Sequence, residues 1–313
     1  MFTLIALAAA AEQARIPYME WDWDQPQRFY VETEVTLPQF MWFVAEKNKT
    51  ARMIGFQLRS VLSCIGGPEK RSGRKRRVRC LVNDVSLSGA SLPGDQDIVQ
   101  PILDEYDGLL TGSVLDLVVR TDGRVTDVNL TGIPAWNLRT RSRRETLRLI
   151  SRFLVAGMEV PLSKRDGDPL WISSQALLCT MPSTFGTAGP AEGVHRASIL
   201  GEQIEIITNG RGMMISGDGA NTYTCDFAAH TLFDPALGVD ERTWTMRAEP
   251  TPGSPIVMGA AGYPFLQRGS LRRLGATETV DVGETTALVP NRDVPSALQN
   301  WPMNPDPTRP KGR

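Results

Sequence analysis

An alternation of apolar and polar residues with a period of two recurs along this sequence and restricts its fold more than any other feature. It is clearest over residues 114–131, VLDLVVRTDGRVTDVNLT, where Asp122 and Gly123 separate two alternating segments. An Asp-Gly pair in this position favours a tight hairpin turn between antiparallel strands. The change of parity between Val125 and Val128 predicts a β-bulge in the second strand.

The same alternation predicts strands in several other segments. These are residues 29–37, 51–64, 76–89, 169–179, 196–234, 242–252 and 270–290. Within residues 196–234, the pair Asn209-Gly210 and the triplet 217–219 (Gly-Asp-Gly) are typical turn sequences and predict a three-stranded meander. Strands that follow one another in runs, and do not alternate with helices, indicate an antiparallel sheet.

One helix is predicted over residues 143–156. Ser142 and Glu145 have the spacing of a capping box, apolar residues follow at helical spacing, and Gly157 provides a stop. Residues 98–110 are mixed in pattern and are compatible with a short helical turn. The expected fold class is therefore mainly β, of the α+β type, with a large twisted antiparallel sheet or half-barrel packed on one main helix.

The N-terminal residues 2–11, FTLIALAAAA, are too short to span a bilayer but are typical of the hydrophobic region of a secretory signal. We expect residues 1–14 to be a signal peptide, residues 15–28 a linker, residues 29–290 a single β-rich domain and residues 291–313 a disordered tail. The alternatives for the apolar run are a buried helix and a retained anchor. No run of eighteen apolar residues occurs, so no transmembrane span is expected.

The four cysteines are even in number and lack the C-x-x-C spacing of zinc ribbons and thioredoxin-like redox sites. Cys64 ends one predicted strand and Cys80 lies early in the next, so a hairpin would bring the two within reach of a disulfide. Cys179 and Cys225 would then form the second pair. Two disulfides fit an exported protein, and the alternative is a cytosolic protein with four buried thiols.

Basic residues are concentrated in two short segments. Residues 70–79 and 139–148 together hold 12 of the 34 basic residues and one of the 35 acidic residues, which leaves 22 against 34, or −12, elsewhere. Such segments attract anionic surfaces, although a solvated loop is the simpler interpretation of the first. The candidate binding residues are Lys70, Arg71, Arg74, Lys75, Arg76 and Arg77 in the basic loop, and Arg141, Arg144 and Arg148 on the helix flank.

Catalytic and metal-binding motifs are absent from the sequence. It contains no G-x-S-x-G and no H-E-x-x-H, and its two histidines are His195 and His230. We therefore expect no catalytic residues, no metal and no cofactor. Aromatic residues do not interleave with the basic segments, and the remainder of the chain is acidic, so we expect no nucleic-acid partner.

The pattern of an apolar N-terminus, a V-L-D-L-V-V-R-T-D-G-R-V hairpin, an Arg-rich helix and a meander with Gly turns resembles uncharacterised exported bacterial proteins. The arrangement also resembles the outer-membrane lipoprotein carrier (LolA/LolB-like) half-barrel, in which an antiparallel sheet curls around helices and holds acyl chains. That resemblance is architectural, has no diagnostic motif and carries over no functional residue.

Together these features predict a non-enzymatic protein of the bacterial cell envelope, periplasmic or secreted, that binds a lipid or another amphipathic ligand between the sheet and the helix. An anionic envelope surface would be a partner of the basic loop. The alternatives are a structural or adhesive cell-surface module that contacts other proteins, and a secreted hydrolase with His195 or His230 as the base.

Overall fold

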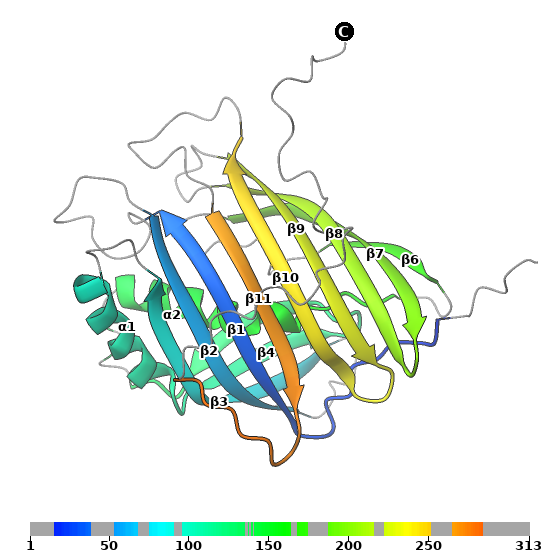
Figure 1. The fold of residues 1–313 in the computed structure, drawn as a ribbon, viewed down its shortest axis with the longest axis horizontal. Coiled ribbons are helices and arrows are strands. Elements are labelled where there is room, and N and C mark those ends of the chain that lie inside the picture. Colours follow the sequence, from blue (N-terminus) through cyan, green and yellow to red (C-terminus); the bar gives the residue numbers. More distant parts are fainter. Residues whose placement is uncertain are drawn as a thin grey trace, which may run out of the picture.

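One antiparallel sheet contains all eleven strands of the described structure (Figure 1). The computed structural model describes residues 16–38, 53–67, 75–90, 96–134, 137, 139, 141–163, 168–174, 187–215, 222–251 and 265–283. The predicted signal peptide and the predicted tail at 291–313 lie outside these residues. The mainly β fold class is confirmed.

The strands form two meanders that meet in the middle of the sheet. The order across it is β5-β4-β3-β2-β1-β11-β10-β9-β8-β7-β6, so the first and last of the described strands are neighbours. Their bounds are β1 (Gln27–Pro38), β2 (Met53–Gly66), β3 (Lys75–Ala90), β4 (Val114–Arg120), β5 (Val125–Thr131), β6 (Leu170–Ser174), β7 (Thr187–Leu200), β8 (Gln203–Ile215), β9 (Thr222–Asp234), β10 (Gly238–Pro250) and β11 (Phe265–Leu274).

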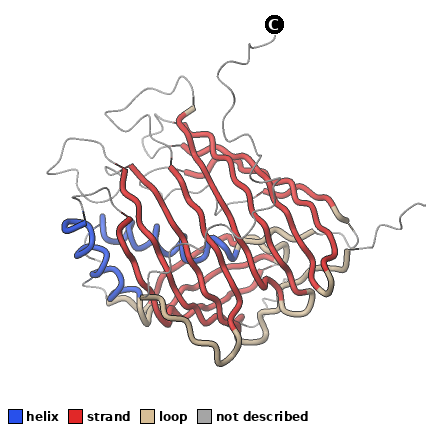
Figure 2. Tube along the Cα trace, viewed as in Figure 1, coloured by secondary structure: helices blue, strands red, loops and turns tan. Residues whose placement is uncertain are grey.

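Two helices of equal length accompany the sheet, so the expected single main helix is not confirmed. They are α1 (Gln96–Leu110) and α2 (Arg141–Val155), and a 3-10 turn, η3 (Ala156–Met158), follows α2 directly. The sheet curls around the second helix, because α2 contacts β5 as well as β1 and β2, and η3 contacts β10 and β11 (Figure 2). α1 packs on β3. Neither helix is long and apolar enough to cross a membrane, as judged over the described residues.

The predicted alternation explains the two faces of the sheet. Along β9, every second residue from Tyr223 to Phe233 is buried, and the residues between them are half-buried. This pattern places one face of the sheet on the core and the other toward solvent. The hairpin of β4 and β5 is also as predicted, and its register shifts where Val119 pairs with Val125, which confirms the bulge.

The turn predicted at Asn209-Gly210 is wrong, because both residues lie inside β8. The turn between β7 and β8 instead contains Gly201, whose φ of +62° a glycine adopts readily. Gly210 has a packing role within the strand. A Cβ atom there would lie 2.0 Å from Cζ of Phe227, so the phenylalanine ring rests against bare backbone.

The helix α1 is longer than the sequence indicates, since only a short turn is expected in that part of the chain. Leu103, Tyr106 and Leu110 are buried at helical spacing, although Gly108 interrupts the pattern. α2 begins at Arg141, so Ser142 lies within its first turn and does not flank the helix as a capping residue would. The second predicted turn of the meander, at 217–219, lies outside the described residues.

The segment 16–26, predicted to be a linker, packs into the hydrophobic core without forming a helix or strand. Trp21 and Trp23 are 5% and 2% exposed, and their rings stack with centroids 4.4 Å apart. Both rings also meet the edge of Phe29 in β1. Gln27 accepts a hydrogen bond of 3.2 Å from the Trp21 indole and donates one of 2.8 Å to the carbonyl of Leu237, which ties the segment to the sheet.

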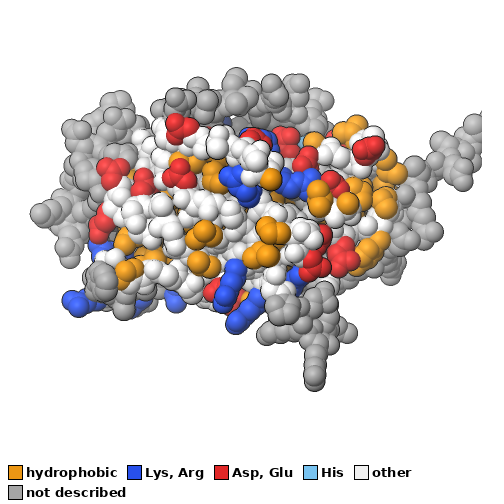
Figure 3. Space-filling model, turned by 90° about the horizontal axis from the view of Figure 1, so that it is seen from below, with side chains coloured by type: hydrophobic (Ala, Val, Ile, Leu, Met, Phe, Trp, Pro, Cys, Tyr) orange, Lys and Arg blue, Asp and Glu red, His pale blue; other side chains and the backbone are white. Residues whose placement is uncertain are grey.

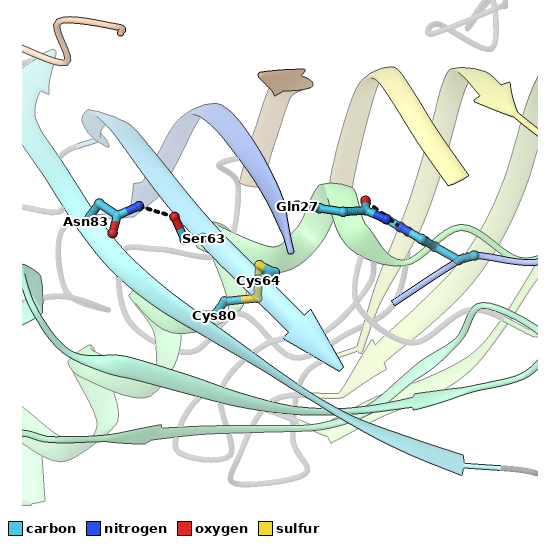
Figure 4. The surroundings of a disulfide bond; sticks show 6 residues. Gln27, Ser63, Cys64, Cys80 and Asn83 are labelled. Carbon is cyan, nitrogen blue, oxygen red and sulfur yellow. Dashed lines mark hydrogen bonds between the residues drawn. A yellow bond between two sulfur atoms is a disulfide. The ribbon is translucent and has the colours of Figure 1, made fainter. Parts of the chain in front are cut away.

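A disulfide joins Cys64 and Cys80, as the hairpin predicted (Figure 4). The two residues are directly opposite in the β2–β3 pair, and both are buried. Next to them on the exposed side, the Asn83 amide donates a hydrogen bond of 2.5 Å to the hydroxyl of Ser63. Cys225 is also disulfide-bonded. Its predicted partner, Cys179, lies outside the described residues.

Candidate ligand-binding face

The buried face of strands β6–β10, called here the inner face, is the best candidate for a functional surface. Among the described elements, the main contacts of the helices α1 and α2 and the turn η3 do not involve β6–β9. Within this face, η3 contacts β10. The inner face is largely apolar and aromatic. Its larger residues include Trp171, Ile206, Tyr223, Phe227, Trp244 and Met246.

A polar cluster lies within this apolar surface. His195, which has no exposed surface, is directly opposite Trp171 on one side and Thr208 on the other. Its Nε2 atom is 2.8 Å from the Ser173 hydroxyl, and its Nδ1 atom is 2.9 Å from the Thr208 hydroxyl. The Trp171 ring stacks on the imidazole, with centroids 5.2 Å apart. Three strands therefore supply one fixed hydrogen-bonded chain.

Burial determines the protonation of this histidine. Desolvation, and to a smaller extent the positive charge of Arg242, lower the pKa of His195 to about 3. The imidazole is therefore neutral at neutral pH. The distance between the Ser173 hydroxyl and His195 is that of a nucleophile and its base in a hydrolase. The second nitrogen of His195, however, meets the Thr208 hydroxyl, where hydrolases place a carboxylate, and an imidazole with a pKa of about 3 is a weak base.

Arg242 is the second unusual group on the inner face. It is 1% exposed, and its Nη1 atom donates a hydrogen bond to the carbonyl oxygen of Glu159. Its Nε and Nη2 atoms are buried, and no described residue accepts a hydrogen bond from either. Desolvation lowers the pKa of Arg242 to about 10, against the favourable charge of Glu159. The guanidinium therefore stays charged at neutral pH with two N–H directions unused.

Other buried donors near Arg242 also lack acceptors. Trp244 lies two residues further along β10 on the same face. Gln267 lies in the neighbouring strand β11, directly opposite Met246 of β10. Among the described residues, the Nε1 atom of Trp244 and the Nε2 atom of Gln267 have no partner. The Nε1 atom of Trp171 also has none, on β6, which is four strands away in the sheet. Native proteins pair nearly all buried polar groups, so several unpaired donors on one face indicate a missing acceptor.

The Trp244 ring is held from two sides. A Cβ atom on Gly157 would lie 2.6 Å from its Cζ3 atom, and a Cβ atom on Gly269 would lie 2.4 Å from its Cζ2 atom. Both contacts are closer than real side chains allow, so only glycine fits at either position. The indole is therefore fixed between η3 and β11, next to Arg242.

The predicted basic loop is only partly within the described residues. Lys70, Arg71 and Arg74 lie outside them, and Lys75, Arg76 and Arg77 belong to the start of β3. Lys75 and Arg77 are exposed. Arg76 is half-buried, pairs with Asp24 and donates a hydrogen bond of 3.1 Å to the carbonyl of Gly67.

The predicted helix flank lies at the start of α2. Arg141 starts α2, Arg144 and Arg148 are exposed, and Arg144 donates to the carbonyl of Arg139 at 3.5 Å. The start of α2 is linked to α1, because Arg143 pairs with Glu105. α1 in turn contacts the far end of β3.

The contact between α1 and β3 lies well along the strand from the described end of the basic loop. Asp107 of α1 accepts a hydrogen bond of 2.7 Å from the backbone of Leu87, twelve positions beyond Lys75 in β3. At about 3.3 Å per residue this is roughly 40 Å along the strand. The described part of the loop, Lys75–Arg77, therefore lies at the opposite end of β3 from the contact with α1, and the binding role of both basic segments stays a prediction.

Exposed apolar side chains gather on the outer face near the β6 edge. Ile172 of β6 is 69% exposed and lies directly opposite Val194 of β7, which is 47% exposed. Leu170, at the start of β6, is also exposed. From below, hydrophobic side chains are gathered on the right, which is the side of β6–β8 (Figure 3).

One signal for the inner face is present in the sequence, although no motif marks it. Arg242, Trp244 and Met246 alternate in β10 and therefore share a face, which places an arginine among core residues. His195 and His230 are both candidate bases by residue type, but the hydroxyl partners of His195 come from separate strands. No group of three or more metal-ligating side chains occurs among the described residues.

Comparisons with known proteins identify no family. No family model matches the chain, and no curated protein matches it. The solved structures that match include one described as "Lipid-protein interactions in lipovitellin", with 8% sequence identity and a TM-score of 0.43. The match covers 84% of this chain, which spans about a quarter of the length of that chain (26%). A likeness at this level carries no argument about function, and the resemblance to lipoprotein carriers is not confirmed.

Proposed function

We propose that this protein binds a lipid or another amphipathic ligand on the inner face of β6–β10 and has no enzymatic activity. The observation that carries the proposal is the combination of an apolar, aromatic surface with buried N–H donors that lack acceptors among the described residues, at Trp171, Arg242 and Trp244. Ligand sites in proteins have this composition, with a few polar groups placed in a mostly hydrophobic lining.

The proposed location is the bacterial cell envelope, after export. The disulfide between Cys64 and Cys80 supports this, because such bonds persist in oxidising compartments. The exposed cations Lys75 and Arg77 at the start of β3 would dock the protein to an anionic surface.

A matched pair of variants tests ligand binding. Ala229 is buried on the inner face between Thr208 and Trp244, and Ala228 is its neighbour on the outer face. We expect the full chain, purified without detergent, to bind monolaurin in calorimetric titrations. Ala229→Leu should weaken binding by about tenfold by occupying the surface, and Ala228→Leu should leave it unchanged.

Native mass spectrometry of the same protein gives an independent measurement, since co-purified lipid would appear as an added mass. The proposal is wrong if no lipid co-purifies and if the wild type binds neither monolaurin nor laurate at millimolar concentrations. Circular dichroism and urea unfolding of both alanine variants would show whether each keeps the fold.

Self-association is a second candidate function, favoured by the exposed apolar pair of Ile172 in the edge strand β6 and Val194 in its neighbour β7. The partner would be a second copy of the chain, as expected for a structural or adhesive surface module. Light scattering after size exclusion should show a dimer that Ile172→Lys abolishes. Leu237→Lys, at an exposed leucine elsewhere, is the control, and a monomer at all concentrations would exclude this function.

A further inference from the structure

We propose that Arg242 holds the anionic head group of the amphipathic ligand, through two oxygen atoms that a carboxylate or a phosphate presents to its Nε and Nη2 atoms. This inference rests on the proposed function and specifies the chemistry of the ligand. The unused atoms of Arg242 carry it, because Nε and Nη2 form one edge of the guanidinium. Their N–H bonds point in the same direction, which is the geometry that pairs with two oxygens on one centre.

Because Arg242 is buried, leaving one edge of its guanidinium without hydrogen-bond acceptors costs free energy. A buried charge without a hydrogen-bonded partner is costly, and proteins seldom keep one. Within the described structure, Arg242 donates to the Glu159 carbonyl, and this neutral oxygen leaves the other edge unused. An anion at that edge would satisfy both N–H groups and add to the favourable charge of Glu159.

The neighbours of Arg242 fit the head and the tail of such a ligand. Trp244 lies on the same face two residues away, and its Nε1 atom is a further donor without a partner among the described residues. In the other direction the inner face continues across β9 and β8 through apolar residues such as Phe227 and Ile206. His195, neutral and fixed by two hydroxyl groups, adds no competing charge.

Access requires movement of the protein, since Arg242 is 1% exposed. The described segment over it is η3 with the residues that follow, because η3 contacts β10 and Glu159 accepts the hydrogen bond from Nη1. Displacement of this segment would open the guanidinium edge. We therefore expect binding to be slow compared with diffusion.

Head-group comparison in the wild-type protein is the first test. Laurate and monolaurin share a tail but differ in charge, and dodecyl phosphate replaces the carboxylate with a phosphate. We expect laurate or dodecyl phosphate to bind about 10–100-fold more tightly than monolaurin, as charged hydrogen bonds at a buried site imply. The tighter of the two anions identifies the head-group class.

Variants of the arginine are the second test. Arg242→Met keeps much of the volume and removes the charge, so it should retain monolaurin binding and lose the preference for the anion. Arg242→Lys keeps the charge without the two-donor edge and should recover only part of the preference. Arg247→Met is the control, because Arg247 lies on the outer face of the same strand, paired with Glu249 at 2.6 Å.

A carboxyl-labelled laurate makes the test independent of variant folding. The ¹³C signal of the bound carboxyl should titrate at a lower pH than that of free laurate, because a guanidinium stabilises the charged form. Equal affinities for laurate, dodecyl phosphate and monolaurin in the wild type would overturn the role of Arg242 and leave the proposed function intact. Absence of binding by all three would overturn both.

Discussion

The buried His195 makes the stability of this protein sensitive to mild acid. In the unfolded chain its pKa is near 6.5, whereas in the folded protein desolvation lowers it to about 3. Below pH 6.5 the unfolded state therefore binds a proton that the folded state does not. The stability that comes from the neutral imidazole is complete above pH 6.5 and is lost as the pH falls toward 3.

The size of the effect follows from the two pKa values of His195. Each pH unit between them removes about 1.4 kcal/mol, so the loss from this residue is about 3 kcal/mol at pH 4.5 and at most about 5 kcal/mol. Asp107 titrates in the opposite sense over this range, so the comparison between variants isolates His195. In urea unfolding, the stability of the wild type relative to His195→Gln, whose amide also bonds to hydroxyls, should fall by about 3 kcal/mol from pH 7.5 to pH 4.5.

The second histidine provides the control. His230 is half-buried and pairs with Glu205 at 2.9 Å, on the other side of the sheet from His195. His230→Gln leaves His195 in its buried site and should keep the loss that His195 causes. Because the chain has two histidines, the variants also assign their imidazole NMR signals. Equal pH dependence in the wild type and His195→Gln, or an NMR titration of His195 near pH 6.5, would refute the reasoning.

Three further changes test the packing and electrostatics. Cys64→Ala with Cys80→Ala opens a disulfide with a sequence separation of 16, and should lower the free energy of unfolding in urea by about 3 kcal/mol. Gly157→Ala places a Cβ atom 2.6 Å from the nearest indole carbon and should cost about 1–3 kcal/mol in the same assay. Burial raises the pKa of Asp107 to about 7. The stability that comes from its neutral carboxyl group is therefore complete below pH 3.8 and is lost as the pH rises through 7. Asp107→Asn should therefore stabilise the protein by about 1–2 kcal/mol at pH 8 and leave it unchanged at pH 4.

Each of these changes has a result that contradicts it. A Cβ atom added to Gly108 in α1 would meet no described atom within 4 Å, so Gly108→Ala should be neutral or stabilising. Equal losses at Gly108 and Gly157 would exclude the steric explanation. A loss below about 1 kcal/mol in the double cysteine variant would exclude the loop-entropy estimate. The same change at pH 4 and pH 8 in Asp107→Asn would show that its charge is not responsible.

Local signals predicted the hairpins correctly, because adjacent strands need only a turn and an alternation. The pair of β4 and β5 follows from Asp122-Gly123, and that of β2 and β3 placed Cys64 opposite Cys80. The turn predicted at Asn209-Gly210 was wrong because Gly210 makes room within β8 for the Phe227 ring of the neighbouring strand. No local sequence pattern reveals such a contact.

The candidate site was beyond sequence reasoning for a related reason. Ser173, His195 and Thr208 come from three strands, and their contacts depend on the register of β6, β7 and β8. α1 was underestimated because Gly108 weakens its pattern and its packing on β3 compensates. Arg242 was visible only as part of an alternating strand, where an arginine is usually exposed.

The pairing of β1 with β11 has a consequence for how the chain folds. The meanders β1–β5 and β6–β10 form from neighbours in sequence, but the contact of Arg28 with Leu274 closes a loop of nearly the whole described chain. Such a closure is slow, and it cannot occur before β11 has been synthesised. Until then β1 and β10 are both unpaired edges, so a nascent or truncated chain is exposed to aggregation at the centre of its future sheet.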